Sequence, residues 1–118
     1  MRTVQKPWGH ELIWAHTSRY VGKILHIKRG ESLSLQYHEQ KDETIMVLSG
    51  LLRFEHYAEG ETPRHTDLSP HQPFHITPGL RHRMTALEDT DVVEVSTPEL
   101  DDVVRLEDRY GRKGTSAA

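Results

Sequence analysis

Short segments in which apolar and polar residues alternate fill most of this chain, with turn residues between them about every eight to twelve positions. Alternation of this kind puts successive side chains on opposite faces of a β-strand. Many short strands separated by close turns are typical of a β-sandwich or barrel, and they argue against a helical or βαβ protein. We therefore expect an all-β fold. Its strands are expected at residues 20–28, 32–38, 44–48, 51–57, 74–77, 81–87 and 91–96.

The residues after the last expected strand leave two structures open. Leu100, Val103, Val104 and Leu106 are spaced so that residues 99–110 could form either a short helix or a final strand. Beyond them, residues 113–118 are expected to be a frayed tail. We expect one domain over residues 1–118, with a barrel core at about 20–97 and a C-terminal extension at 98–112.

The composition excludes several classes of protein. No run of apolar residues approaches the roughly 18 that a membrane span needs, and the first residues lack the apolar stretch of a secretory signal. The absence of cysteine excludes disulfides, thiolate zinc sites and cysteine nucleophiles. Fifteen Lys and Arg oppose 18 Asp and Glu, with no basic stripe, so neither nucleic acid nor a membrane is an expected partner. A cytoplasmic protein is expected.

Four residues have a spacing that predicts a metal site. Gln36 and His38 are two positions apart and share one face of a strand, and Glu43 follows across a polar turn. His82 opens a later strand behind the turn Pro78-Gly79. Two neutral imidazoles, a carboxylate and an amide oxygen make a mixed site for one divalent metal ion, zinc first, with manganese, iron, cobalt or nickel also compatible. The seven other histidines are isolated and are expected to be non-ligands: His10, His16, His26, His56, His65, His71 and His75.

Two stretches around these four residues resemble the two motifs of the cupins, which are small jelly-roll barrels. The first stretch is spaced as Gly30, Gln36, His38, Glu43 and Gly50, and the second is the run Thr77-Pro78-Gly79-Leu80-Arg81-His82. The family usually has histidine at the position of Gln36. The resemblance implies a single small cupin domain, a double-stranded β-helix with one metal ion in its barrel and with N- and C-terminal extensions.

Further stretches are similar to the cupin domain of type II mannose-6-phosphate isomerases, a branch in which glutamine at position 36 is typical. They are Lys6-Pro7-Trp8-Gly9, Tyr20, Ser34-Leu35-Gln36, Val47-Leu48-Ser49-Gly50, Pro78-Gly79 with His82-Arg83, and residues 105–112. The chain departs from that branch at Lys41, where arginine is common, and at Thr44-Ile45, where a histidine and an aromatic residue are common. These changes flank Glu43 and would reshape the pocket floor.

The resemblance implies a metal-dependent aldose–ketose isomerase that works through a cis-enediolate on a sugar phosphate or sugar acid. On strand 20–28, Lys23 shares the inward parity of Leu25 and Ile27 and also falls at a lysine of the family pattern, so it is the candidate catalytic residue. It could act as a base, bind phosphate or simply extend to solvent from the strand end.

Arginines are the candidates for binding a phosphate or carboxylate, because guanidinium matches such groups bidentately. By parity with His82, Arg81 and Arg83 point away from the metal site, so Arg105 and Arg109 are the preferred substrate-binding residues. The alternative for these C-terminal arginines is a surface ladder of ion pairs with Glu107 and Asp108.

Two other functions remain open. The chain could be a non-catalytic cupin that binds a carbohydrate or another acidic ligand, or an iron-dependent cupin oxygenase, although Gln36 counts against the oxygenase. A homodimer is expected, because a small barrel with a lean core gains burial by pairing. Trp8 is expected either to plug one end of the barrel or to lie in a subunit contact.

Overall fold

The computed structural model describes residues 1–111 and 114–115, and these residues form an all-β structure, as the sequence predicted. No helix in the described part of the chain is long and apolar enough to cross a membrane. In chain order the strands are β1 (Arg2–Lys6), β2 (Gly9–His16), β3 (Val21–Ile27), β4 (Leu35–Tyr37), β5 (Glu43–Ser49), β6 (Leu52–Tyr57), β7 (Arg64–Leu68), β8 (Pro73–Ile76), β9 (Arg81–Ala86), β10 (Thr90–Ser96), β11 (Val104–Glu107) and β12 (Gly114–Thr115).

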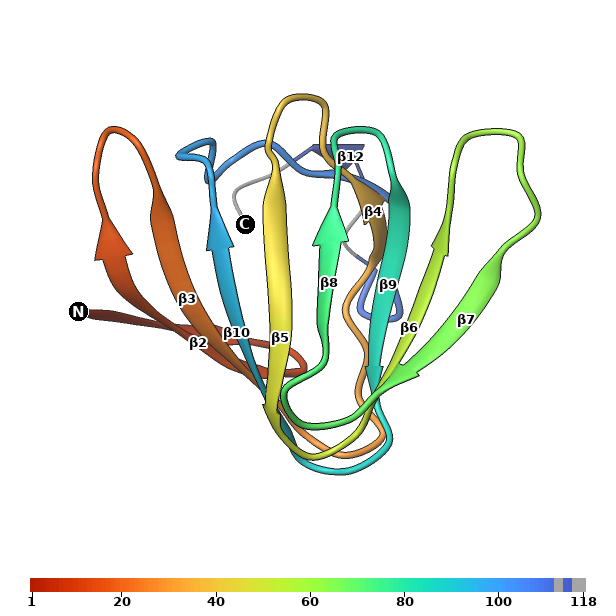
Figure 1. Cartoon of the computed structure of the whole chain (residues 1–118), viewed down its shortest axis with the longest axis horizontal. Helices are drawn as coiled ribbons and strands as arrows, with labels where there is room; N and C mark the ends of the chain where they lie inside the picture. The colour runs from red at the N-terminus through yellow and green to blue at the C-terminus, as the bar shows by residue number, and fades with distance from the viewer. Residues whose placement is uncertain (112–113, 116–118) are drawn as a thin grey trace.

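The strands make two antiparallel sheets that face each other. The first sheet has the order β1-β2-β3-β10-β5-β8, and the second has the order β12-β11-β4-β9-β6-β7. The loops β3–β4, β5–β6 and β9–β10 gather at one end of the molecule, where the sheets converge, and the strands fan apart toward the other end (Figure 1). Neighbours such as β3 and β10 lie far apart in the sequence, which is typical of a jelly roll.

The core lies between the two sheets and is built by strand alternation. Ile45 and Val47 of β5 and Leu52 and Phe54 of β6 are fully buried, whereas the residues between them are more exposed. Trp8, from the turn between β1 and β2, is also buried and packs into this core cluster. Burial of such side chains is the main favourable contribution to folding.

Three segments differ from the expected strands. Residues 2–16 form the hairpin β1–β2, which extends the first sheet through pairing with β3. Strand β7 was not expected, because its residues are mostly exposed and polar and give no apolar alternation. Of the two structures open for residues 99–110, the strand is found, because β11 pairs with β4. The expected frayed tail, 113–118, lies outside the described residues except for β12.

The two glycines of the first motif occupy different surroundings. Both have positive φ, +82° at Gly30 and +95° at Gly50. A Cβ atom at Gly50 would lie 2.4 Å from the carbonyl oxygen of Asp89, whereas a Cβ atom at Gly30 would meet nothing within 4 Å. Gly50 is therefore required both by its backbone conformation and by the close approach of the β9–β10 turn, and Gly30 by its conformation alone.

We predict that Gly50→Ala lowers the free energy of unfolding by about 3 kcal/mol, because the strain of positive φ adds to a steric clash. Gly30→Ala is the matched control and should lower it by about 1 kcal/mol, from backbone strain alone. Urea denaturation of both variants measures the difference. Equal losses would contradict this account of Gly50.

Candidate metal centre

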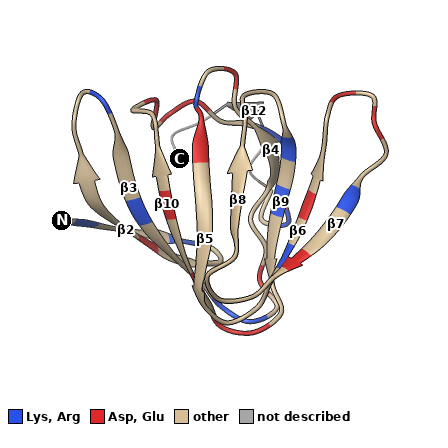
Figure 2. Cartoon of the chain, in the orientation of Figure 1, with Lys and Arg blue, Asp and Glu red and all other residues tan. Residues whose placement is uncertain are grey.

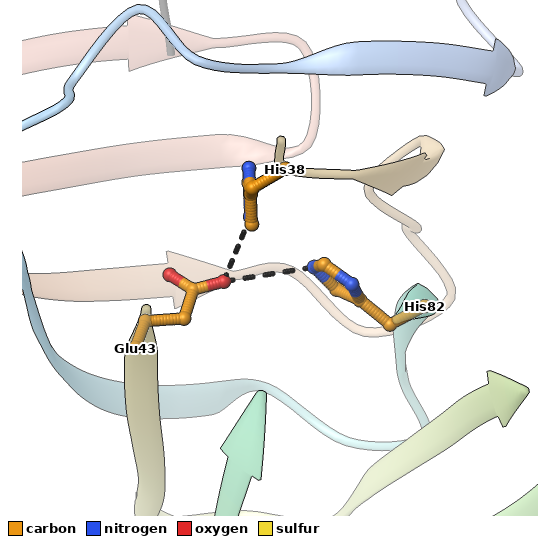
Figure 3. A group of neighbouring side chains, drawn as sticks. All are labelled: His38, Glu43 and His82. Carbon is orange, nitrogen blue, oxygen red and sulfur yellow. Dashed lines mark hydrogen bonds and ion pairs between the residues drawn. The ribbon is translucent and has the colours of Figure 1, made fainter. Parts of the chain in front are cut away.

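Three buried side chains from separate segments of the chain converge at the open end of the barrel. His38 follows β4, Glu43 begins β5 and His82 lies near the start of β9, and each is at most 3% exposed. One Glu43 oxygen, Oε1, is 2.9 Å from Nε2 of His38 and 3.6 Å from Nε2 of His82 (Figure 3). One ligand atom from each residue lies within 4.8 Å of the other two, so the three could share one metal ion.

The backbone fixes the orientation of both imidazole rings. Nδ1–H of His38 donates to the carbonyl oxygen of Asp102 at 2.6 Å, and Nδ1–H of His82 donates to that of Leu80 at 2.9 Å. A carbonyl oxygen can only accept, so each Nδ1 carries a proton and each Nε2 is directed toward Glu43. Metal-binding histidines are commonly held in this way, with the second ring nitrogen donating to a carbonyl or carboxylate.

The loop that carries His38 is held by the C-terminal segment. The Asp102 carboxylate accepts hydrogen bonds from the backbone N–H groups of Glu39, Gln40 and Lys41, at 3.0, 2.7 and 2.8 Å. Partial burial raises the pKa of Asp102, but these three donors outweigh it, so the pKa is lowered overall. Asp102, which follows β10, therefore positions His38 in the β4–β5 loop, far earlier in the chain.

Lys41 balances the charge of two buried carboxylates. Its Nζ lies 3.5 Å from Oε2 of Glu43 and 3.4 Å from Oε2 of Glu94. Burial alone would raise the pKa of Glu43, but the charge of Lys41 and the hydrogen bond from His38 outweigh it and hold that pKa well below its usual range. Burial and the charge of Glu43 raise the pKa of Glu94, against the attraction of Lys41. Glu43 is thus the ionised carboxylate at the centre.

The two histidines differ in their electrostatic surroundings. Burial lowers the pKa of His82 to about 4, against the attraction of Glu43. Burial also opposes a charge on His38, but the hydrogen bond and the charge of Glu43 outweigh it and raise the pKa of His38. His82 is consequently a neutral imidazole at pH 7, which is the form that binds metals.

The nitrogen and oxygen atoms that these side chains direct at one another fit a divalent cation as ligands. Nε2 of His38 and Oε1 of Glu43 are too close for two bare acceptors, so a positive species, either a proton or a metal ion, must lie between them. Imidazole nitrogen with carboxylate oxygen is a common ligand combination for zinc and its first-row neighbours. The fourth predicted ligand, Gln36 on β4, is the register partner of His82 on β9 and lines the same cavity.

A narrow cavity of about 50 Å³ opens beside the three side chains. Its lining includes two of the other predicted site residues, Lys23 and Arg105. Lys23 is 2% exposed, and its Nζ lies 3.5 Å from Oε1 of Glu11. Arg105 on β11 is opposite Gln36 and is 8% exposed. Figure 2 shows charged segments in the middle of β3 and β10 and at the upper end of β5, and Lys23, Glu94 and Glu43 of these strands line the cavity.

Other predicted residues lie elsewhere. Arg109 is exposed, does not line the cavity and donates to the carbonyl oxygen of Gly30. Arg81 and Arg83 are also absent from the lining, consistent with their predicted parity: Arg81 stacks over the Tyr37 ring at 4.0 Å. None of the seven histidines expected to be non-ligands belongs to the one candidate metal cluster found in residues 1–111.

Two buried charged residues of the cavity, Glu11 and Glu94, were not anticipated. Lys41 was expected at the pocket floor, but its burial was not expected. Glu11 lies in the hairpin that was not expected to form strands. Lys41 lies in a polar turn, where no periodicity predicts burial. In residues 91–96 valines occur at both parities, so alternation alone could not tell whether Glu94 points inward. The inward direction of Glu94 follows from its pairing with Lys23, which lies directly opposite on β3. The pairing of two strands cannot be read from the sequence of either one alone.

Comparison with known proteins identifies the family. Residues 1–108 match the family model described as mannose-6-phosphate isomerase C-terminal. The chain belongs to this family. Mannose-1-phosphate guanylyltransferase ManC of Salmonella typhimurium is 36% identical over 94% of this chain and 23% of its own length. Xanthan biosynthesis protein XanB of Xanthomonas campestris is 33% identical over 94% of this chain and 24% of its own length. The chain thus spans about a quarter of the length of these relatives.

Solved structures with the same fold are cupins. KdgF from Halomonas sp. has a TM-score of 0.69 and 28% identity, over 83% of this chain and 88% of that one. The capsular polysaccharide assembling protein CapF from Staphylococcus aureus has a TM-score of 0.75 and 21% identity, over 90% of this chain and 31% of that one. The cupin resemblance of the sequence motifs is therefore confirmed.

We predict that Lys41→Met lowers the free energy of unfolding of the metal-free protein by about 3 kcal/mol, because Glu43 and Glu94 stay buried without their shared cation. Adding Glu94→Gln removes one of the two carboxylates that Lys41 had balanced and should recover about 1 kcal/mol or more. Urea denaturation of both variants measures this. If the double variant were no more stable than the single one, the assigned charge balance would be wrong.

Proposed function

We propose that this protein is a metal-dependent aldose–ketose isomerase that acts on a sugar carrying an acidic group, such as a mannose-6-phosphate-like sugar phosphate. The observation that carries the proposal is the convergence of His38, Glu43 and His82 beside a charged cavity. The proposal is also supported by the family to which the chain belongs, which is described as mannose-6-phosphate isomerase C-terminal. The reaction moves a proton between C1 and C2 of the sugar through a cis-enediolate, with no net oxidation.

His38, Glu43 and His82, with Gln36 as the fourth ligand, are the residues that would hold the metal ion. A divalent ion bound there supplies a Lewis acid for the sugar oxygens on C1 and C2. The hydrogen bonds from Nδ1 of both histidines keep the Nε2 atoms directed at the site. Lys41 holds the second oxygen of Glu43, so that the first faces both imidazoles.

In this proposal the Glu11–Lys23 pair carries the proton transfer. Both side chains line the cavity, are at most 3% exposed and lie away from the metal-binding residues in the sequence. The carboxylate of Glu11 takes the proton from C2 and returns it to C1, and the hydroxyl proton passes from the oxygen on C2 to the oxygen on C1. The ammonium group of Lys23 donates a hydrogen bond to the sugar oxygen on which negative charge develops.

The charges that line the cavity favour an anionic sugar. Four cationic side chains, Lys6, Lys23, Lys41 and Arg105, face three carboxylates, so the lining is positive even before a divalent ion is counted. Arg105 is the residue we assign to the phosphate or carboxylate, because its guanidinium can bind either group through two parallel hydrogen bonds. Arg109 has no part in the proposal, since it lies outside the cavity.

The proposal predicts that the metal-loaded protein exchanges solvent deuterium into C2 of mannose-6-phosphate or a related aldose phosphate. Replacing Glu11 with Gln and Lys23 with Met together removes both charges of the pair, so neither member is left buried without the other. This double variant should lose exchange by about 100-fold or more, while its metal content stays unchanged. Nuclear magnetic resonance of the sugar measures the exchange.

Arg105→Met is the complementary variant, because it should raise KM for the sugar phosphate far more than it lowers kcat. If no aldose phosphate tested showed exchange, the proposed isomerase activity would be wrong. Binding of those sugars without exchange would instead support a metal-containing cupin that binds acidic carbohydrates and does not transform them.

A further inference from the structure

The side chains that would bind and transform a sugar are closed off from solvent. His38, Glu43 and His82 are each at most 3% exposed, and so are Glu11 and Lys23. The cavity beside them has a volume of about 50 Å³, which is room for a few water molecules. Pockets that bind small organic ligands usually have volumes of about 300–1,000 Å³. A sugar phosphate therefore reaches this cavity only if part of its wall moves.

The part of the wall that can move at least cost is the segment between β10 and β11. Residues 97–103, here called the C-terminal strap, belong to none of the strands, whereas β3 and β10 are paired along their whole length. After β10 the chain crosses the open end of the barrel (Figure 1). Val103, at the end of the strap, is buried and lines the cavity. Displacing the strap widens the cavity and leaves the pairing of the sheets intact.

The strap is folded on itself, so its residues can move together. The backbone N–H of Leu100 donates to the carbonyl oxygen of Pro98 at 2.8 Å. The N–H of Val103 donates to the carbonyl oxygen of Asp101 at 3.0 Å. These bonds lie within the strap and survive when it leaves the barrel.

The strap is bound to the β4–β5 loop at two points. At its start, the N–H of Thr97 donates to the carbonyl oxygen of Asp42, and the N–H of Asp42 donates to Oγ1 of Thr97, both at 3.0 Å. Near its end, the carboxylate of Asp102 accepts the hydrogen bonds from the N–H groups of residues 39–41. Because both points lie on one loop, the strap and the loop separate by breaking one set of neighbouring hydrogen bonds.

We infer that the C-terminal strap moves away from the β4–β5 loop to admit the sugar and then returns, and that the carboxylate of Asp102 holds it closed. The inference rests on the proposed function for the identity of the ligand. The carbonyl oxygen of Asp102 also accepts from Nδ1–H of His38 at 2.6 Å, so this imidazole has its partner only while the strap is closed. Closure thus excludes water and fixes the orientation of His38 before the proton is transferred.

Hydrogen exchange of the backbone amides, measured by nuclear magnetic resonance on the zinc-loaded full chain, tests the inference. The amide of Thr97 should exchange at least about tenfold faster than those of Ile45 and Val47 in β5, because the strap opens while the sheet stays paired. Asp102→Ala should speed exchange at Thr97 at least about tenfold more, although it leaves the bond from Thr97 to Asp42 in place.

Asp101→Ala is the matched control, because it removes an exposed carboxylate from the same strap one residue earlier, and it should leave exchange at Thr97 unchanged. Asp102→Asn keeps one acceptor oxygen and should give an intermediate rate. Circular dichroism identifies any variant that fails to fold. A Thr97 amide that exchanges as slowly as those of β5 would overturn the inference, and so would equal effects of Asp101→Ala and Asp102→Ala.

Stopped-flow fluorescence of Trp8, which lines the cavity, connects the strap to sugar entry. Mannose-6-phosphate should associate with the zinc-loaded Asp102→Ala variant at least about tenfold faster than with the unmodified protein, since less of the protein is closed. Equal association rates would mean that the sugar enters elsewhere and would contradict the inference. If the sugar bound to neither protein, the proposed function would be wrong, whereas exchange at Thr97 would still decide whether the strap opens.

Discussion

The ionised Glu43 is the group on which the candidate site depends. A buried carboxylate is unfavourable unless positive charge and hydrogen bonds surround it, and here both of its oxygens are engaged. One oxygen faces His38 and His82, and the other faces Lys41. These partners come from the β4–β5 loop and from β9, so a single carboxylate on the first sheet links both sheets at the open end of the barrel.

The charge that surrounds Glu43 continues along the inner wall of the first sheet. Lys41 also pairs with Glu94, Glu94 is opposite Lys23 in the strand register, and Lys23 pairs with Glu11. Five charged side chains thus take positions inside a small barrel that apolar side chains would otherwise fill. Such an arrangement adds little to stability, since buried ion pairs barely offset their desolvation. We attribute it to the chemistry of the cavity, where a protein departs from the pattern that stability alone would favour.

The sequence predicted the fold class, because strand alternation and motif spacing are local signals. Of its four ligand candidates, His38, Glu43 and His82 lie together, and Gln36 is the register partner of His82. It did not predict the hairpin β1–β2 or the roles of Glu11, Lys41 and Glu94. Burial of those charged residues is decided by pairing across strands and by a loop held by Asp102, which no local pattern encodes. Arg109 resembled Arg105 in the sequence, yet of these two it is Arg105, opposite Gln36 in the strand register, that lines the cavity.

The most direct test of the account is X-ray absorption spectroscopy of the zinc-loaded protein. The account predicts nitrogen and oxygen ligands at about 2.0–2.1 Å, with scattering from two imidazole rings. Both imidazole contributions should disappear when His38 and His82 are replaced by alanine together. A bound metal without imidazole scattering, or an unchanged spectrum in that double variant, would contradict the central claim that these histidines share one ion with Glu43.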